Sequence, residues 1–169
     1  MNKLIEDLRG KLMMGSHGYA GELGHVQVNL GHDVPCTCGK VGHLEAVASG
    51  TGIESSYARF TGEKKSGPEI SDLANKGDKD AVASIELAGR SLGRIIAMYL
   101  SIFDPEKIVL GGSVIKSGKI WEDALHKGFD EEVIGEISEN LNLCEAELGA
   151  NAALIGAAEY ALDRLEENE

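Results

Sequence analysis

The sequence predicts an α/β domain whose short strands are at least partly parallel. Segment 107–112 is an apolar run ending in two glycines, which is typical of a buried parallel strand and its turn. Before it, segment 78–103 has apolar residues spaced three and four apart, as in one long helix. A strand at 141–148 and an alanine-rich helix at 152–165 continue the alternation. The length suits one unit, so we expect residues 1–169 to form a single domain.

The other expected elements are shorter. Residues 1–14 fit either a strand–turn–strand or a short helix. Alternation over 25–30 predicts a strand, and Asp104-Pro105 ends the long helix. The remaining expected segments are a turn-rich loop over 31–42, helices over 44–59, 70–76 and 121–129, and a polar loop over 61–68.

Composition excludes several classes of function. The formal net charge is −12, which disfavours binding to nucleic acid or to anionic membranes, because phosphate contacts need clustered Lys and Arg. No apolar run approaches the roughly 20 residues that cross a bilayer. Acidic residues also stand near the N-terminus, where a signal peptide would be apolar. We therefore expect a cytoplasmic protein that binds neither nucleic acid nor membrane.

Four potential metal ligands stand close together in the chain. His25, Cys36, Cys38 and His43 supply the number and type of ligands that a closed tetrahedral zinc site needs. Nearby glycines let the backbone turn tightly around an ion. Because four protein ligands leave no open position for a water molecule, we expect the zinc to be structural.

Other interpretations of these residues stay open. The two cysteines would also fit a reduced, metal-free loop, and His17 and His32 are competing ligands. The chain has three cysteines, an odd number, and disulfides are not expected in a reducing compartment. Cys144 lies in an apolar alternation and is expected to be a buried small hydrophobic residue.

Two carboxylates flank the candidate metal ligands. Glu22 lies in a segment flanked by glycines, and Glu45 follows His43 by two positions. Rigidly held carboxylates accept hydrogen bonds from several hydroxyls, as in the orientation of a sugar. If His25 binds a metal through one ring nitrogen, the other nitrogen can donate to a ligand oxygen. Solvated surface charge is the alternative interpretation of both carboxylates.

A glycine pair follows the apolar strand. Gly111, Gly112 and Ser113 lie at its carboxyl end, where ligands bind in open α/β sheets. Glycines there let a flat ring or a phosphate approach the backbone. A simple tight turn between strand and helix is the alternative.

Three segments resemble the ROK family of bacterial sugar kinases and related repressors. The segments are Gly-Glu-Leu-Gly-His at 21–25, Cys-Thr-Cys-Gly-Lys-Val-Gly-His-Leu-Glu at 36–45, and Ala-Ser-Gly at 48–50. Residues 108–113 look like the adenosine-contacting turn of that family, and residues 151–158 are similar to its closing helix. The resemblance spans roughly residues 10–162 and implies the carboxy-terminal lobe of an actin-like (ribonuclease H-like) ATPase fold with a zinc-binding loop.

The resemblance also implies roles for individual residues. Glu22, His25 and Glu45 would contact sugar hydroxyls, and His25 would double as a zinc ligand beside Cys36 and Cys38. The family usually has a third cysteine where this chain has His43, so the site would become Cys2His2. Gly111, Gly112 and Ser113 would contact the nucleotide, although ATP and magnesium are expected only for a complete two-lobed kinase.

The resemblance does not extend to the catalytic groups of the family. The amino-terminal Asp-x-Gly-Gly-Thr phosphate loop, the second glycine-rich phosphate loop and the Asn-Asp pair that provides the general base have no counterpart in this sequence. We therefore assign no catalytic residue and expect a chain that is inactive alone, although the family activity is ATP-dependent phosphorylation of a hexose or N-acetylhexosamine.

Three functional hypotheses follow. The first is the zinc- and sugar-binding half of a glucokinase-like transferase, completed by a missing amino-terminal lobe. The second is a non-enzymatic sugar sensor or regulator of the ROK repressor type that acts through a partner chain, although no basic helix-turn-helix segment is evident. The third is a structural zinc module in an oligomer. Under each of them, exposed apolar surface would favour a homo-oligomer or binding of the missing lobe.

Overall fold

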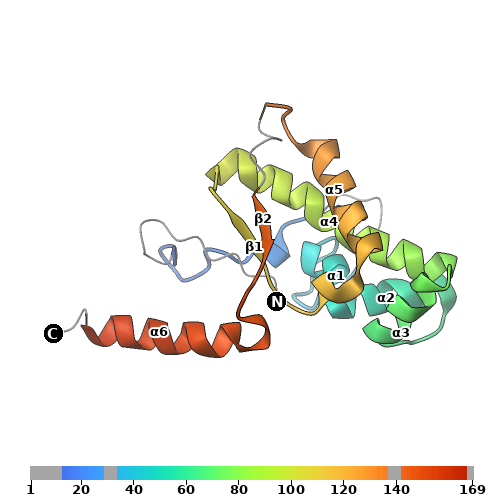
Figure 1. Cartoon of the computed structure of the whole chain (residues 1–169), viewed down its shortest axis with the longest axis horizontal. Helices are drawn as coiled ribbons and strands as arrows, with labels where there is room; N and C mark the ends of the chain where they lie inside the picture. Colours follow the sequence, from blue (N-terminus) through green and yellow to red (C-terminus); the bar gives the residue numbers. More distant parts are fainter. Residues whose placement is uncertain (1–12, 29–33, 137–141, 167–169) are drawn as a thin grey trace.

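The computed structural model describes residues 13–28, 34–136 and 142–166 (Figure 1). Short helical segments come first, the longest helix lies in the middle, and two short strands flank a further helix. In chain order the elements are η1 (Leu23–His25), α1 (Leu44–Ala48), α2 (Gly50–Thr61), α3 (Gly67–Asn75), α4 (Lys79–Phe103), β1 (Ile108–Leu110), η2 (Val114–Ser117), α5 (Lys119–Glu132), β2 (Leu143–Glu145), η4 (Gly149–Asn151) and α6 (Ala152–Glu166).

The central helix α4 begins and ends where the sequence predicts. The Asp78 side chain caps its first turn by accepting a hydrogen bond of 2.8 Å from the Ala81 N–H. Asp104 ends the helix in the left-handed conformation, with φ of 43°, directly before Pro105. The apolar residues of α4 are buried along most of its length, so the prediction of one long helix is confirmed.

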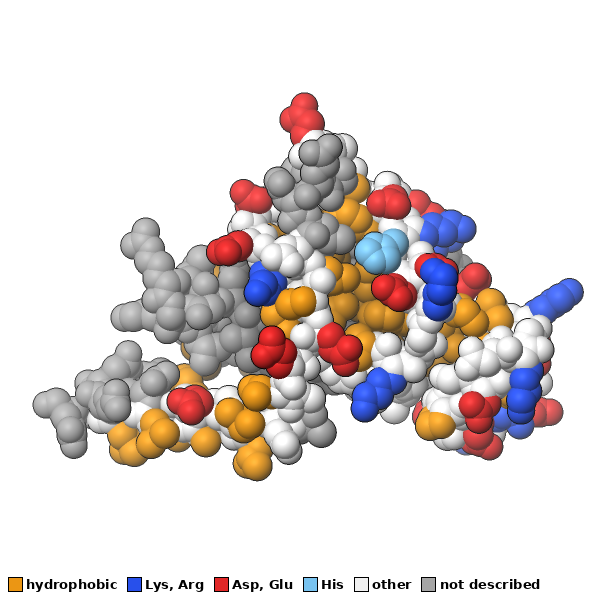
Figure 2. Space-filling model, in the orientation of Figure 1, with side chains coloured by type: hydrophobic (Ala, Val, Ile, Leu, Met, Phe, Trp, Pro, Cys, Tyr) orange, Lys and Arg blue, Asp and Glu red, His pale blue; other side chains and the backbone are white. Residues whose placement is uncertain are grey.

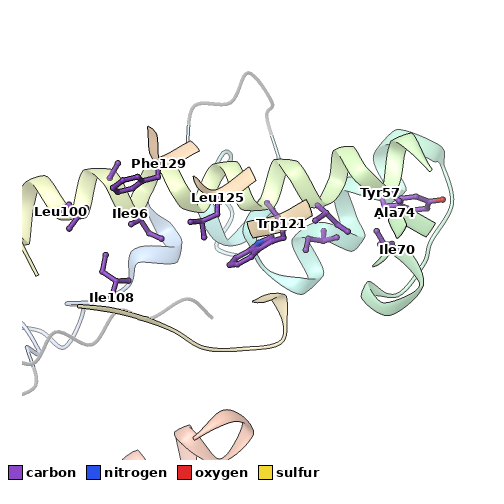
Figure 3. Packing of buried hydrophobic residues seen from close by; sticks show 14 residues of the cluster. Tyr57, Ile70, Ala74, Ile96, Leu100, Ile108, Trp121, Leu125 and Phe129 are labelled. Carbon is purple, nitrogen blue, oxygen red and sulfur yellow. The ribbon is translucent and has the colours of Figure 1, made fainter. Parts of the chain in front are cut away.

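Helices α4 and α5 pack against each other at very short range. A Cβ atom on Gly89 would lie 2.4 Å from the Trp121 carbonyl oxygen, and one on Gly128 would lie 2.1 Å from that of Arg90. These glycines therefore allow the two backbones to touch. The main core forms around this contact and includes Leu125 and Phe129 (Figure 3).

The two strands are parallel, which confirms the α/β class. Ile108 pairs with Leu143, Val109 with Cys144, and Leu110 with Glu145. Helix α5 makes the crossover between the strands, as in other βαβ units. The side chain of Cys144 is only half-buried, where the sequence predicts a buried small hydrophobic residue.

A second core cluster fixes the segment that carries the candidate metal ligands. Val28, Val34, Leu44 and Val47 pack against Ile95 and Tyr99 of α4, and the exposed fraction of Leu44 is 1%. Full burial of these side chains contributes about 1.5–3 kcal/mol each. The segment is thus held against the long helix by its own apolar residues.

Two sequence predictions near this segment need correction. The helix predicted over 44–59 is broken at Ser49, whose extended backbone (φ −84°, ψ 167°) separates α1 from α2. The strand predicted over 25–30 is mostly wrong: His25 ends the 3-10 turn η1, and Gln27 forms only an isolated bridge. Positions 29–30, together with most of the ambiguous segment 1–14 and the competing ligand at position 32, lie outside the described residues.

Helix α6 extends away from the rest of the chain (Figure 1), and apolar side chains line it in Figure 2. Leu154 and Leu165 have exposed fractions of 75% and 68%. Large apolar side chains on a helix are normally covered, so α6 has the character of a helix that binds another surface. Within the described ranges, no helix combines the length and apolar character needed to cross a membrane.

Candidate metal and ligand site

A tight hairpin carries the two cysteines. Pro35 and Val41 form an antiparallel bridge, and the Cys36 N–H donates to the Lys40 carbonyl at 2.7 Å. Between them, the Gly39 N–H donates to the Cys36 carbonyl at 2.9 Å, and Gly39 has φ of 85°. Because only glycine adopts this φ without strain, Gly39 lets the chain reverse within three residues.

A second antiparallel pairing brings the two histidines together. The Val28 N–H donates to the Gly42 carbonyl at 2.7 Å, and the Leu44 N–H donates to the Val26 carbonyl at 2.9 Å. These bonds run on either side of the Gln27–His43 bridge. As a result, the ring centroids of His25 and His43 lie 5.4 Å apart, although the residues are far apart along the chain.

The four predicted metal ligands converge. One ligand atom from each of His25, Cys36, Cys38 and His43 lies within 4.8 Å of all the others. Cys38 Sγ is 3.2 Å from His43 Nδ1, and Cys36 Sγ is 3.8 Å from His25 Nδ1. Bond lengths of about 2.0–2.3 Å in a tetrahedral zinc site put neighbouring ligand atoms about 3.5 Å apart. The donor set and its geometry thus fit zinc with small adjustments.

His25 links this cluster to Glu45. Its Nδ1 faces Cys36, while its Nε2 lies 3.8 Å from Glu45 Oε2. That distance is longer than a hydrogen bond, and both side chains are partly exposed, so each group remains accessible to a ligand hydroxyl. Metal-binding histidines commonly direct their second nitrogen to a carboxylate, which orients the ring.

Glu22 belongs to the same local structure. It is the N-cap residue of η1, and its carbonyl accepts a hydrogen bond of 3.1 Å from the His25 N–H. The backbone thus ties Glu22 to His25, while Glu45 lies in the first turn of α1. Both predicted sugar-binding carboxylates therefore belong to segments that adjoin the cluster.

The predicted nucleotide-binding turn borders a groove of about 360 Å³. Gly112 has φ of 111°, and Ser113 Oγ would lie 3.9 Å from a Cβ atom on Gly50, at the start of α2. The same groove is lined by Leu23 and Leu44, which are neighbours of Glu22 and Glu45 in the chain. The glycine turn and the carboxylate-bearing segments thus border one hollow.

Two residues that line this groove receive no role from the sequence alone. Ser49 caps α2 by accepting a hydrogen bond of 3.0 Å from the Gly52 N–H, and the Ser-Gly pair was a usable signal for it. Tyr99 is buried in α4, and burial raises the pKa of its phenol. Only the tertiary structure brings Tyr99 to the groove. His17 is exposed and lies outside the converging cluster.

Similarity to known structures defines the class of protein. The structure superimposes on a ROK hexokinase from Thermus thermophilus with a TM-score of 0.82 and 30% identity, over 95% of this chain and 53% of that one. The fold is therefore that of the actin-like sugar kinases and their relatives.

Sequence similarity assigns the family. The ROK family model matches residues 8–164, and the chain belongs to this family. The chain is 40% identical to the N-acetyl-D-glucosamine kinase of Haemophilus influenzae, over 68% of this chain and 41% of the relative. It is also 32% identical to an N-acetylglucosamine repressor of Escherichia coli, over 86% of this chain and 38% of the relative. The chain thus spans only about two fifths to one half of these relatives.

Proposed function

We propose that this chain is the sugar-binding half of an ATP-dependent ROK kinase for a hexose or N-acetylhexosamine. The observation that carries the proposal is the position of His25, between the cluster of potential metal ligands and the carboxylate of Glu45. Similarity to an N-acetyl-D-glucosamine kinase and to a hexokinase supports the choice of substrate class.

In this proposal His25, Cys36, Cys38 and His43 hold a structural zinc ion. The ion supplies a cross-link between segments with little regular secondary structure. His25 Nδ1 binds it, which leaves an N–H at Nε2 to donate to a sugar oxygen. Glu22 and Glu45 accept hydrogen bonds from sugar hydroxyls and so orient the ring.

The nucleotide is proposed to bind at Gly111, Gly112 and Ser113. Phosphoryl transfer depends on positioning and charge stabilisation by phosphate loops, magnesium and a general base. We assign none of these groups to this chain. Catalysis is therefore proposed to require the amino-terminal half of a ROK kinase, and the chain alone is proposed to bind sugar without phosphorylating it.

The alternative function is a sugar-responsive regulator that acts through a partner chain. The similarity to an Escherichia coli repressor over 86% of this chain supports it. In both proposals the protein is cytoplasmic, contacts neither nucleic acid nor membrane with these residues, and forms either a homo-oligomer or a complex with an amino-terminal lobe.

Isothermal titration tests the sugar site directly. Glucose and N-acetylglucosamine are titrated into zinc-loaded protein, into Glu22→Gln and Glu45→Gln, and into Glu86→Gln as a control on the exposed face of α4. We expect binding that weakens at least tenfold in the first two variants and is unchanged in the control. Absence of binding to every sugar, or equal affinity in all variants, contradicts the proposal.

A second assay separates the kinase from the regulator. ADP release is measured with sugar, ATP and magnesium after addition of an amino-terminal half from a ROK kinase. Sugar-dependent turnover in the reconstituted complex favours the kinase, whereas sugar binding without turnover in that complex favours the regulator.

A further inference from the structure

The two cysteines of the candidate metal site differ in their access to solvent. Cys38 lies in the exposed tip of its hairpin, whereas the side chain of Cys36 is buried, with an exposed fraction of 7%. Residues 37–41 are all exposed, and nothing lies within 4 Å of a Cβ atom placed on Gly39. The tip therefore has room to change its conformation, and an oxidant in solution meets Cys38 before Cys36.

The two sulfur atoms are also within reach of each other. One ligand atom from each member of the cluster lies within 4.8 Å of all the others, and each cysteine contributes its Sγ. A disulfide needs Cα atoms about 4.4–6.8 Å apart. Residues two positions apart in the chain are separated by at most about 7 Å. A bond between Cys36 and Cys38 therefore requires movement of the hairpin tip but no unfolding of the chain.

The third cysteine of the chain has a different environment. Cys144 lies in β2, is half-buried and does not belong to the cluster. The pair of Cys36 and Cys38 thus combines an exposed sulfur with a second sulfur close behind it. This is the arrangement of a redox-sensing thiol and the cysteine that resolves it.

We infer that Cys38 is a site of thiol oxidation by hydroperoxides and that the stable product is a disulfide with Cys36. The inference rests on the proposed function and deepens it, because it assigns a form of regulation to the same site. Sulfurs bound to zinc are thiolates, which are the nucleophilic form. Hydrogen peroxide is small and uncharged, so a chain of net charge −12 does not repel it as it would an anionic disulfide. In a reducing compartment such a bond is transient, as in redox sensors.

The reaction balances with the peroxide as the sole oxidant. The Cys38 sulfur attacks one peroxide oxygen, so an S–O bond forms, the O–O bond breaks and hydroxide leaves. The Cys36 sulfur then attacks the sulfur of this sulfenic acid, so the S–S bond forms, the S–O bond breaks and a second hydroxide leaves. Both hydroxide ions take a proton from the solvent. Two thiolates thereby lose two electrons in total, and one peroxide becomes two water molecules.

The disulfide removes half of the candidate ligand set. Only His25 and His43 remain, and two ligands do not make the closed tetrahedral site that holds a structural zinc ion. The ion would leave, and His25 Nδ1 would lose the bond that it makes beside Cys36. The orientation of His25 Nε2 next to Glu45 depends on that bond. Oxidation at the hairpin should therefore weaken sugar binding, although neither cysteine is proposed to touch the sugar.

The test treats the zinc-loaded chain with hydrogen peroxide. Cys144→Ser is the matched control, because it removes the thiol outside the cluster and leaves the pair intact. Released zinc is measured with a colorimetric chelator. After alkylation of free thiols, mass spectrometry is applied to the tryptic peptide 12–40, which contains Cys36 and Cys38 but not Cys144.

We expect both proteins to release their zinc and to yield a peptide 12–40 that carries no alkyl group and is lighter by two hydrogens. Dithiothreitol should restore two alkylation sites. Zinc that stays bound, a peptide that remains fully alkylated, or Cys38 that carries only added oxygen would each overturn the inference.

Titration with sugar separates this inference from the proposed function. Glucose and N-acetylglucosamine are titrated into the reduced chain, the oxidised chain, and the oxidised chain after dithiothreitol and zinc. We expect affinity to fall at least about tenfold on oxidation and to recover afterwards. Equal affinity of the reduced and oxidised chains overturns the regulation and leaves the sugar site standing. Absence of binding to the reduced chain contradicts the proposed function, whereas the peptide mass still decides whether the disulfide forms.

Discussion

The contact between α4 and α5 gives a quantitative prediction for Gly93→Ala. A Cβ atom on Gly93 would lie 1.9 Å from the Leu125 carbonyl oxygen and 2.7 Å from the Phe129 nitrogen. Reaching ordinary contact, which begins near 3.4 Å, requires the helices to separate by about 1.5 Å. Backbone atoms form the obstacle, so no rotamer change relieves it.

Two opposing effects set the size of the change. Overpacking of a well-packed core costs about 1–3 kcal/mol, and backbone contact places this site at the upper end. Alanine recovers up to about 1 kcal/mol over glycine inside a helix. We expect the free energy of unfolding to fall by about 2 kcal/mol and Tm by about 4–8 °C.

Urea denaturation followed by circular dichroism measures this change. The control is Gly156→Ala in α6, where nothing lies within 4 Å of the added carbon. The control should be at least as stable as the original chain, because only helix propensity changes. If Gly93→Ala is as stable as Gly156→Ala, the close approach of α4 and α5 is wrong.

Two further predictions concern the cluster of candidate metal ligands and an ion pair. Cys38→Ser should lower the zinc content, measured by elemental analysis, well below one ion per chain. Cys144→Ser is the control, because Cys144 lies outside the cluster, and it should leave the zinc content unchanged. Near-stoichiometric zinc in Cys38→Ser would refute the ligand assignment. A hydrogen bond from Arg90 lowers the pKa of Glu131, so this carboxylate contributes stability above about pH 4.5 that is lost as the pH falls towards its folded-state pKa. The urea midpoints of Glu131→Gln and of the original chain should therefore differ at pH 7 and converge in acid. Asp130→Asn is the control for the loss of one negative charge. A difference between the midpoints that does not vary with pH would contradict this explanation.

Sequence reasoning was most accurate where local signals decide the structure. The long helix α4 has both a capping aspartate and an unbroken apolar stripe, and its predicted bounds differ from those observed by one residue. The strand 107–112 and the helix 152–165 were also found, because their apolar pattern and glycines are local features. The predicted strand over 25–30 is mostly wrong within the described residues, because His25 belongs to the 3-10 turn η1 and the antiparallel pairing with 42–44 is limited to one bridge at Gln27.

The candidate site was predicted in its residues but not in its geometry. The spacing of His25, Cys36, Cys38 and His43 indicated a metal site, and the structure brings all four together. The spacing in the sequence did not show which ring nitrogen of His25 faces the cluster, because that depends on the Gln27–His43 pairing. The break at Ser49 was also not predicted, although two glycines, poor helix formers, follow it at positions 50 and 52.

The sequence by itself determined the family, the identity of the candidate metal ligands and the glycine turn after β1, because these depend on residue identity and short spacing. Only the tertiary structure decided that His25 faces Glu45 and that Tyr99 and Ser49 line the same groove as the glycine turn. These features come from contacts between residues far apart in the chain. Such contacts form when apolar burial against α4 fixes the loops, and no local pattern encodes them.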